Sequence, residues 1–233
     1  MKVAALIPCR TGSKGIPGKN FREFNGTPLW IWTYNAALAS GVFDKIILSS
    51  NGGFSGAVLR ADGVTVLDNS RPKELCTDTA TTDQVLTYYA YENRDVDLWA
   101  ILQVTSPLRT ADDIRAAYDR IKGKKYDSLV SVVPNPGMIW IDKACGVAGV
   151  EYPIATYHIH KRPMRQDRGD WFMENGAIYF TKTYVIEQMH CRLGGKIVLH
   201  PMSPEHSLEI DTELDWEIAE FVARRGVKNV LAA

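Results

Sequence analysis

The stretch VAALIPCRTGSKGIPGKN, residues 3–20, indicates the fold class that the rest of the chain follows. Its first part, residues 3–8, is a short apolar run of the kind that forms a buried strand in a parallel sheet. The loop that follows carries Arg10, Lys14 and Lys19 and no acidic residue. In α/β proteins, ligands sit beyond the carboxyl ends of the strands. The stretch therefore predicts an α/β fold with an anion site after its first strand.

The glycines of this loop indicate contact with phosphate groups. Gly12, Gly15 and Gly18 allow sharp turns and let backbone N–H groups approach phosphate oxygens. Their GxxGxxG spacing differs from the GxGxxG of dinucleotide-binding proteins and from a Walker A loop, where Ser or Thr stands in place of Asn20. A flexible, solvated basic loop is the alternative. Its place directly after the first strand favours a nucleoside triphosphate ligand.

Strand and helix patterns alternate along most of the chain. The predicted strands are 3–8, 45–49, 64–67, 98–103, 128–133, 177–180 and 196–200, and the predicted helices are 28–40, 54–61, 78–91, 110–122 and 212–225. Thr110 and Asp113 have the spacing of a helix-capping box. This order predicts a doubly wound, mainly parallel sheet, and residues 1–233 fit a single domain.

Regularity breaks over residues 134–172. This stretch is rich in proline, glycine and aromatic residues and holds His158 and His160. We expect an excursion from the sheet, used as an arm for dimer contacts. The two histidines share one face of a strand without an evident third ligand, so a zinc site is not predicted.

Two further segments carry polar side chains suited to a nucleotide. In residues 71–82, Arg71 suits a base carbonyl or a phosphate, and Thr81 and Thr82 suit ribose hydroxyls. A loop followed by a helix cap at Asp78 or Thr79 explains part of the same segment. In residues 102–109, the predicted strand brings Gln103, Thr105 and Ser106 to the carboxyl edge of the sheet. Arg109 suits either a contact with a ligand or a surface position at the start of a helix.

The last segment pairs two carboxylates. Glu209 and Asp211 alternate in an extended stretch and share one face. Two carboxylates on one face suit a hard cation such as Mg²⁺, which also binds substrate phosphates. The alternative is that Asp211 or Thr212 merely caps the last helix.

Composition excludes several classes of partner. The 27 basic and 27 acidic residues give a formal net charge of zero, which argues against nucleic acid and anionic membrane surfaces. No apolar stretch is long enough to cross a bilayer. The four cysteines contain no CxxC spacing, so we expect a reduced, cytoplasmic protein.

Taken in order, six blocks resemble the acylneuraminate cytidylyltransferase family, the CMP–sialic acid synthetases. They are IPCRTGSKGIPGKN (7–20), RPKELCTDTATT (71–82), LQVTSPLRT (102–110), RQ (165–166), NGAIY (175–179) and SLEIDTELDW (207–216). The resemblance implies a nucleotide-diphospho-sugar transferase-like fold. It also implies transfer of CMP from CTP to a nonulosonic, sialic-acid-like sugar acid with release of pyrophosphate, in a homodimer that requires Mg²⁺ or Mn²⁺.

The resemblance also assigns roles to residues. It implies catalytic roles for Arg10, Lys14, Lys19 and Asp211, and metal binding by Glu209 and Asp211. The residues implied in nucleotide binding are Arg10, Gly12, Ser13, Lys14, Asn20, Arg71, Ala80 and Thr82. Those implied around the acceptor are Gln103, Thr105, Ser106, Arg165, Gln166, Asn175 and Tyr179. The arm at 134–172 is expected to cross to the neighbouring subunit and to contribute to acceptor binding.

Three departures from the family pattern concern the acceptor more than the nucleotide. Glu209 stands where aspartate is usual, residues 49–51 read Ser-Ser-Asn where an acidic residue is common, and 136–140 lack a usual lysine. Sialic, legionaminic and pseudaminic acids, a phosphonate, or another acidic acceptor fit this pattern. A transferase of the same fold using another nucleotide, and a catalytically inactive nucleotide-binding regulator, are the competing functions.

Overall fold

The computed structural model describes residues 1–12, 15–52, 64–68, 71–77, 79–142, 153–168 and 171–226. Ser13, Lys14, Asp78 and the predicted helix at 54–61 lie outside these residues. None of the helices within them combines the length and hydrophobicity that crossing a membrane needs.

In the described residues the centre of the fold is a seven-stranded sheet with the order β11-β7-β10-β6-β1-β4-β5. Its strands are β1 (Val3–Pro8), β4 (Lys45–Ser49), β5 (Thr65–Asp68), β6 (Leu98–Leu102), β7 (Ser128–Pro134), β10 (Phe172–Lys182) and β11 (Ile197–Pro201). β1 pairs in parallel with β4 and β6, β4 with β5, and β11 with β7. The prediction of a mainly parallel sheet is therefore confirmed.

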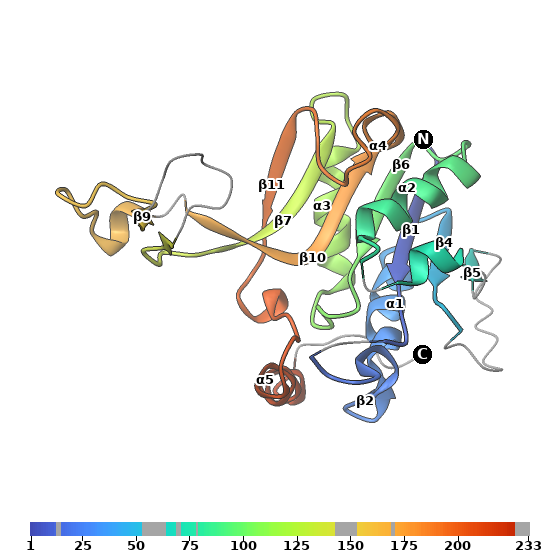
Figure 1. Ribbon diagram of the computed structural model, residues 1–233, viewed down its shortest axis with the longest axis horizontal. Coiled ribbons are helices and arrows are strands. Elements are labelled where there is room, and N and C mark those ends of the chain that lie inside the picture. The colour runs from blue at the N-terminus through green and yellow to red at the C-terminus, as the bar shows by residue number, and fades with distance from the viewer. Residues whose placement is uncertain are drawn as a thin grey trace.

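β10 is the exception, because it runs antiparallel to β6 and to β7 on either side. β7 leads out of the sheet and β10 returns from the same end, so the two strands necessarily run in opposite directions. The prediction from sequence assigned this strand only residues 177–180. The structure extends it to Phe172–Lys182 because its first part continues beside β7 towards the arm (Figure 1).

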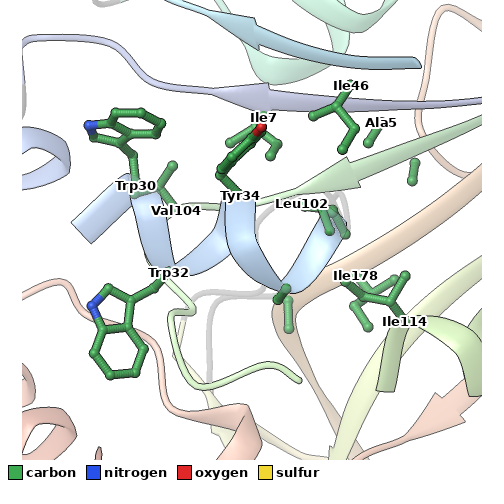
Figure 2. Close-up of a cluster of buried hydrophobic side chains, with 14 of the residues drawn as sticks. Ala5, Ile7, Trp30, Trp32, Tyr34, Ile46, Leu102, Val104, Ile114 and Ile178 are labelled. Atoms are coloured by element: carbon green, nitrogen blue, oxygen red, sulfur yellow. The ribbon is translucent and has the colours of Figure 1, made fainter. Parts of the chain in front are cut away.

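Helices cover both faces of the sheet. α1 (Leu29–Ser40), α3 (Ala111–Ile121) and α5 (Glu213–Arg224) contribute to one buried core, and α2 (Thr82–Glu92) and α4 (Thr183–Met189) to the other. In the first core, apolar side chains of β1, β4, β6 and β10 meet aromatic side chains of α1 (Figure 2). Strands buried on both faces explain why their sequences are apolar throughout rather than alternating.

Capping boxes fix where three helices begin. Thr110 and Asp113 form the predicted box at the start of α3. The predicted start of α2 at Asp78 is wrong, because Thr81 and Gln84 form a box that was not recognised and the helix begins at Thr82.

At α5, Thr212 caps the helix and pairs with Asp215. The side chain of Asp211 is therefore not the cap, which leaves its carboxylate available elsewhere.

The predicted excursion is an arm that projects from the sheet (Figure 1). Its described part holds the two-stranded β8 (Trp140–Ile141) and β9 (Ile154–Ala155) and the short 3-10 helix η3 (Arg165–Arg168). Large apolar side chains are exposed on it: Ile139 (45%), Trp140 (54%), Ile141 (45%), Ile159 (52%) and Met164 (61%). Exposed apolar surface of this extent is unusual in a monomeric protein.

An aromatic cluster anchors α5 to the beginning of the fold. Phe24, in the hairpin of β2 (Glu23–Phe24) and β3 (Thr27–Pro28), is fully buried. Its ring lies 5.2 Å from Trp32 of α1 and 5.5 Å from Trp216 of α5, both edge to face. Because α5 follows directly after Glu209 and Asp211, this cluster also sets where the two carboxylates lie.

Replacing Phe24 with alanine removes the centre of this cluster and leaves a cavity, so we expect Phe24→Ala to lower the free energy of unfolding by about 3–5 kcal/mol. Phe221→Ala on the exposed side of α5 is the control, with an expected loss below about 1 kcal/mol. Urea denaturation measures both. A similar loss in the two variants would show that the cluster does not anchor α5.

Candidate active site

A cleft of about 540 Å³ opens at the carboxyl ends of β1 and β6. Segments far apart in the sequence line it: the loop after β1, the segment before and at the start of α2, the turn after β6, and the stretch before α5. The predicted site residues that line it are Arg10, Lys19, Asn20, Arg71, Ala80, Thr82, Gln103, Thr105, Glu209 and Asp211. The structure thus brings together most of the predicted site.

Lys19 joins the two walls of the cleft. The residue is 7% exposed, and its Nζ donates to the carbonyl of Ile210 and lies 3.1 Å from Oδ1 of Asp211. Asn20, equally buried, donates from Nδ2 to the carbonyl of Arg10 at 2.9 Å. The basic loop is therefore held in shape from within and attached to the carboxylate segment.

Gly15 is required by a close approach rather than by loop flexibility. A Cβ atom at this position would overlap the carbonyl oxygen of Asp211, whereas one at Gly12 would meet nothing within 4 Å. Only glycine lets the loop pack directly on the backbone of the carboxylate segment.

Arg71 is oriented by the end of β4. It is 7% exposed, and it donates from Nε to Oγ of Ser49 at 2.9 Å and from Nη2 to the Ser49 carbonyl at 2.7 Å. Oγ of Ser49 lies 2.7 Å from the hydroxyl of Tyr89. Ser49, the first residue of the Ser-Ser-Asn stretch at this strand end, thus holds the arginine.

Glu209 and Asp211 both face the cleft because Ile210 between them is buried in the core. The Ile210 amide donates to the Thr105 carbonyl at 2.8 Å, and Oγ1 of Thr105 donates to Oε1 of Glu209 at 3.3 Å. The pKa of Glu209 is raised, first by burial and then by the negative charge of Asp211. Two nearby carboxylates that repel one another gain from a cation between them.

The donor set fits Mg²⁺. The described residues contain no group of three or more His, Cys, Asp or Glu side chains arranged to hold a metal ion. Mg²⁺ is usually held by one or two carboxylates together with substrate phosphates and water, so this pair suffices when a triphosphate is bound. Glu209 and Asp211 are the side chains that would hold it.

Ser106, Asn175 and Tyr179 were expected at the acceptor, but the structure does not place them on the cleft. Ser106 is fully buried, with Oγ 3.5 Å from the Asn175 carbonyl. Tyr179 lies in the core between the sheet and α2, where its hydroxyl donates to Glu174 and its ring lies 5.0 Å from the guanidinium of Arg192. Burial raises the pKa of Tyr179, and the hydrogen bond to Glu174 adds to it.

Asn175 makes the hydrogen bonds at a β-bulge in β10. The register with β7 shifts between Glu174 and Tyr179, and Gly176 has a φ of 68°. At this bulge, Oδ1 of Asn175 accepts from Ser131 Oγ at 2.6 Å and from the Ala177 amide at 3.2 Å. Its Nδ2 donates to Ser207 Oγ at 2.8 Å. These bonds replace the strand-to-strand hydrogen bonds that the bulge removes. Asn175 therefore supports the shape of the cleft without lining it.

The remaining predicted residues lie away from the cleft. Arg165 and Gln166 are exposed in η3 on the arm and do not line the cleft. Gly12 is exposed beside the cleft without lining it.

Sequence reasoning missed several features of the site. Arg109 is not a surface residue at a helix start: it is fully buried beneath the turn after β6. Thr81, which was predicted together with Thr82 as a candidate for ribose hydroxyls, lines the cleft, whereas its role as the cap of α2, signalled by the Thr-x-x-Gln spacing of 81–84, was not predicted. The apolar lining residues Pro8, Val85 and Val104 carried no signal that separated them from core residues.

Comparison with known sequences gives a consistent family. A family model described as cytidylyltransferase matches residues 4–188. N-acylneuraminate cytidylyltransferase A of Danio rerio is 34% identical over 218 residues, covering 94% of this chain and 50% of that protein. N-acylneuraminate cytidylyltransferase of Streptococcus agalactiae serotype III is 32% identical over 223 residues, covering 93% of this chain and 52% of that protein. The chain spans about half the length of these relatives.

Solved structures share the fold. A CMP:2-keto-3-deoxy-manno-octonic acid synthetase complexed with CTP superposes with a TM-score of 0.66 at 15% identity, covering 97% of this chain and 99% of that one. The 2-C-methyl-D-erythritol 4-phosphate cytidylyltransferase of Thermus thermophilus gives 0.61 at 16% identity, covering 96% and 100%. At these identities the similarity establishes the architecture, which is the nucleotidyltransferase α/β fold predicted.

The contact at Gly15 can be tested by adding a single methyl group. Gly15→Ala pushes the loop off the Asp211 backbone, and we expect it to lower the free energy of unfolding by about 1–3 kcal/mol, as overpacking does. Gly12→Ala, in the same loop but in open space, is expected to change it by less than about 0.5 kcal/mol. Urea denaturation compares them, and equal values would show that the loop does not pack on Asp211.

Proposed function

Because the chain belongs to the cytidylyltransferase family, we propose that it transfers CMP from CTP to a hydroxyl of a nonulosonic, sialic-acid-like sugar acid and releases pyrophosphate. The named relatives support the nucleotide and the class of acceptor. Within the chain, one observation carries the proposal: a cationic loop and a pair of carboxylates face the same cleft and are joined by the Lys19–Asp211 contact.

This pairing suits a triphosphate and a metal ion together. The triphosphate lies along the loop, where Arg10, Lys19 and the glycine backbone neutralise its charge, and Ser13 and Lys14 belong to the same loop. Cytosine and ribose lie towards Arg71, Ala80 and Thr82, which also line the cleft. Arg71 supports this assignment because Ser49 already fixes the direction of its guanidinium.

We further propose Mg²⁺, with Mn²⁺ as a substitute, as the cofactor held by Glu209 and Asp211. When bound, the ion offsets negative charge on the α-phosphate and on the leaving pyrophosphate. Lys19 keeps the Asp211 carboxylate turned towards the loop, so this carboxylate would hold the ion on the side of the cleft where the loop would hold the phosphates.

The acceptor occupies the side of the cleft formed by Gln103 and Thr105. Its hydroxyl oxygen forms a bond to the α-phosphorus of CTP while the bond to the bridging oxygen breaks, and pyrophosphate leaves with that electron pair. The hydroxyl proton passes to solvent. The chain's contribution is to orient the two substrates and to neutralise charge, which is the general basis of catalysis in phosphoryl-type transfer.

We also propose that the arm forms a homodimer. The exposed apolar side chains of the arm support this, since the described part of the arm contributes no buried residue to either hydrophobic core. In a dimer of this kind, Arg165 and Gln166 reach the acceptor side of the neighbouring subunit's cleft, where Arg165 supplies the cation that a sugar carboxylate needs.

The reaction is tested by pyrophosphate release from CTP in the presence of Mg²⁺ and a panel of sialic, legionaminic and pseudaminic acids. At least one acid should support turnover. Lys19→Met, which removes the buried ammonium, should lower turnover by about 100-fold or more because one charge-stabilising group is lost.

Lys124→Met removes an exposed lysine outside the cleft and should leave turnover unchanged. Absence of release with every acid in the panel would contradict the proposed reaction, and stronger thermal stabilisation by GTP than by CTP would overturn the choice of nucleotide.

The dimer is tested by placing a charge in the arm. Trp140→Asp introduces an anion into the proposed apolar contact, so sedimentation equilibrium should show a monomer where the parent chain is dimeric. Leu214→Asp on α5 is the matched control, because its side chain is 65% exposed against 54% for Trp140. A parent chain that is monomeric at micromolar concentration, or dissociation of both variants, would contradict a dimer through the arm.

A further inference from the structure

Arg109 is a buried cation that the proposed reaction does not use. It follows β6 in the turn that leads to α3, and its side chain is fully buried. Burial lowers the pKa of Arg109 to about 9, and the charge of Asp113 opposes this shift only in part. Burying a charged guanidinium costs desolvation free energy that an apolar side chain of similar volume would not cost. The presence of an arginine at this position therefore needs a specific reason.

The hydrogen bonds of Arg109 join three separate elements. Nη1 donates to the Ala177 carbonyl of β10 at 2.6 Å, and Nη2 donates to Oγ1 of Thr33 in α1 at 2.8 Å. Both nitrogens also lie 3.3 Å from the carbonyl oxygen of Gln103, at the end of β6. The planar fork of an arginine meets several oxygens at fixed angles, which a lysine cannot do.

Each of these contacts supports the acceptor side of the cleft. Gln103 lines the cleft directly, and its carbonyl is fixed by Arg109 and, at 3.4 Å, by Thr33. Ala177 lies in β10 directly after the bulge at Gly176, and β10 runs beside β6. Arg109 therefore holds both the turn that presents Gln103 and the part of β10 that adjoins it.

The nucleotide side is held by other contacts. Arg71 is oriented by Ser49 at the end of β4, and Asn20 holds the loop through the Arg10 carbonyl. The hydrogen bonds that Arg109 makes to β6, β10 and α1 involve neither of these two groups. The two halves of the cleft thus have separate supports.

We propose that Arg109 is a positioning residue for the acceptor half of the cleft: its guanidinium sets Gln103 and the adjoining part of β10, whereas Arg71 and the loop after β1 do not depend on it. This inference rests on the proposed function for the identity of the two halves. If the inference is right, replacing the guanidinium changes the acceptor KM or kcat and leaves the KM for CTP unchanged.

Arg109→Lys keeps the charge and removes the fork. We expect the acceptor KM to rise or kcat to fall by about tenfold, since at least one bond to a charged group is lost, while the KM for CTP stays within about twofold. Thr33→Val, which removes the same network's hydroxyl, should change the acceptor kinetics in the same direction but less. In the double variant, the fold-change in acceptor kinetics should be smaller than the product of the fold-changes in the two single variants, because both residues belong to one network.

The matched control is Arg115→Lys, an arginine of α3 that donates to the Ala39 carbonyl at 2.8 Å and is far more exposed. It should leave both KM values and kcat unchanged. Arg109→Lys could instead change the KM values for CTP and acceptor equally, or lower the amount of active protein with unchanged KM values. Either result would show that Arg109 only stabilises the fold.

Hydrogen exchange gives a readout that does not depend on turnover. In Arg109→Lys and in Thr33→Val, backbone amides of residues 103–106 and 175–177 should exchange faster, and those of 19–22 should not. Uniform acceleration across both sets, or none in either, would overturn the proposal. If no sugar acid supports pyrophosphate release in the parent chain, the proposed function fails, and the exchange pattern still decides the role of Arg109.

Discussion

The contact between Lys19 and the Asp211 segment organises the whole site, because it connects regions that are distant in the chain. It joins a loop that follows the first strand to a stretch that precedes the last described helix, 192 residues later. A buried ammonium has to be neutralised or hydrogen-bonded, and here a carbonyl and a carboxylate do both. Once this contact forms, the basic, glycine-rich loop and two carboxylates face each other across one cleft.

The centre of the sheet supports that arrangement from behind. The bulge in β10 turns Gly176 towards Glu209, and Ser131 and Asn175 satisfy the backbone groups that the bulge leaves unpaired. The Asn-Gly pair of the NGAIY block therefore acts through backbone geometry, and its tyrosine acts in the opposite core. Residues typical of a family motif can thus shape the cleft without lining it.

Charge is balanced over the whole chain but concentrated within the cleft. The formal net charge is zero, whereas the cleft gathers the cations Arg10, Lys19 and Arg71 and the carboxylates Glu209 and Asp211. A local field of this kind orients a charged ligand without attracting polyanions to the whole surface. Apolar surface is similarly concentrated, since the described arm exposes five large apolar side chains over a short stretch of chain.

Local signals in the sequence were enough to predict the mainly parallel sheet, most helix and strand positions, and the segments that line the cleft, because apolar periodicity, glycine spacing and capping pairs act over a few residues. They were not enough for the antiparallel course of β10, the start of α2 at Thr82, or the positions of Ser106, Asn175 and Tyr179. Which side of a strand faces a cleft depends on register and on a bulge, and these follow from pairing with distant strands. The burial of Arg109 likewise follows from the folded chain alone, because its acceptors on β6, β10 and α1 come from three separate parts of the sequence.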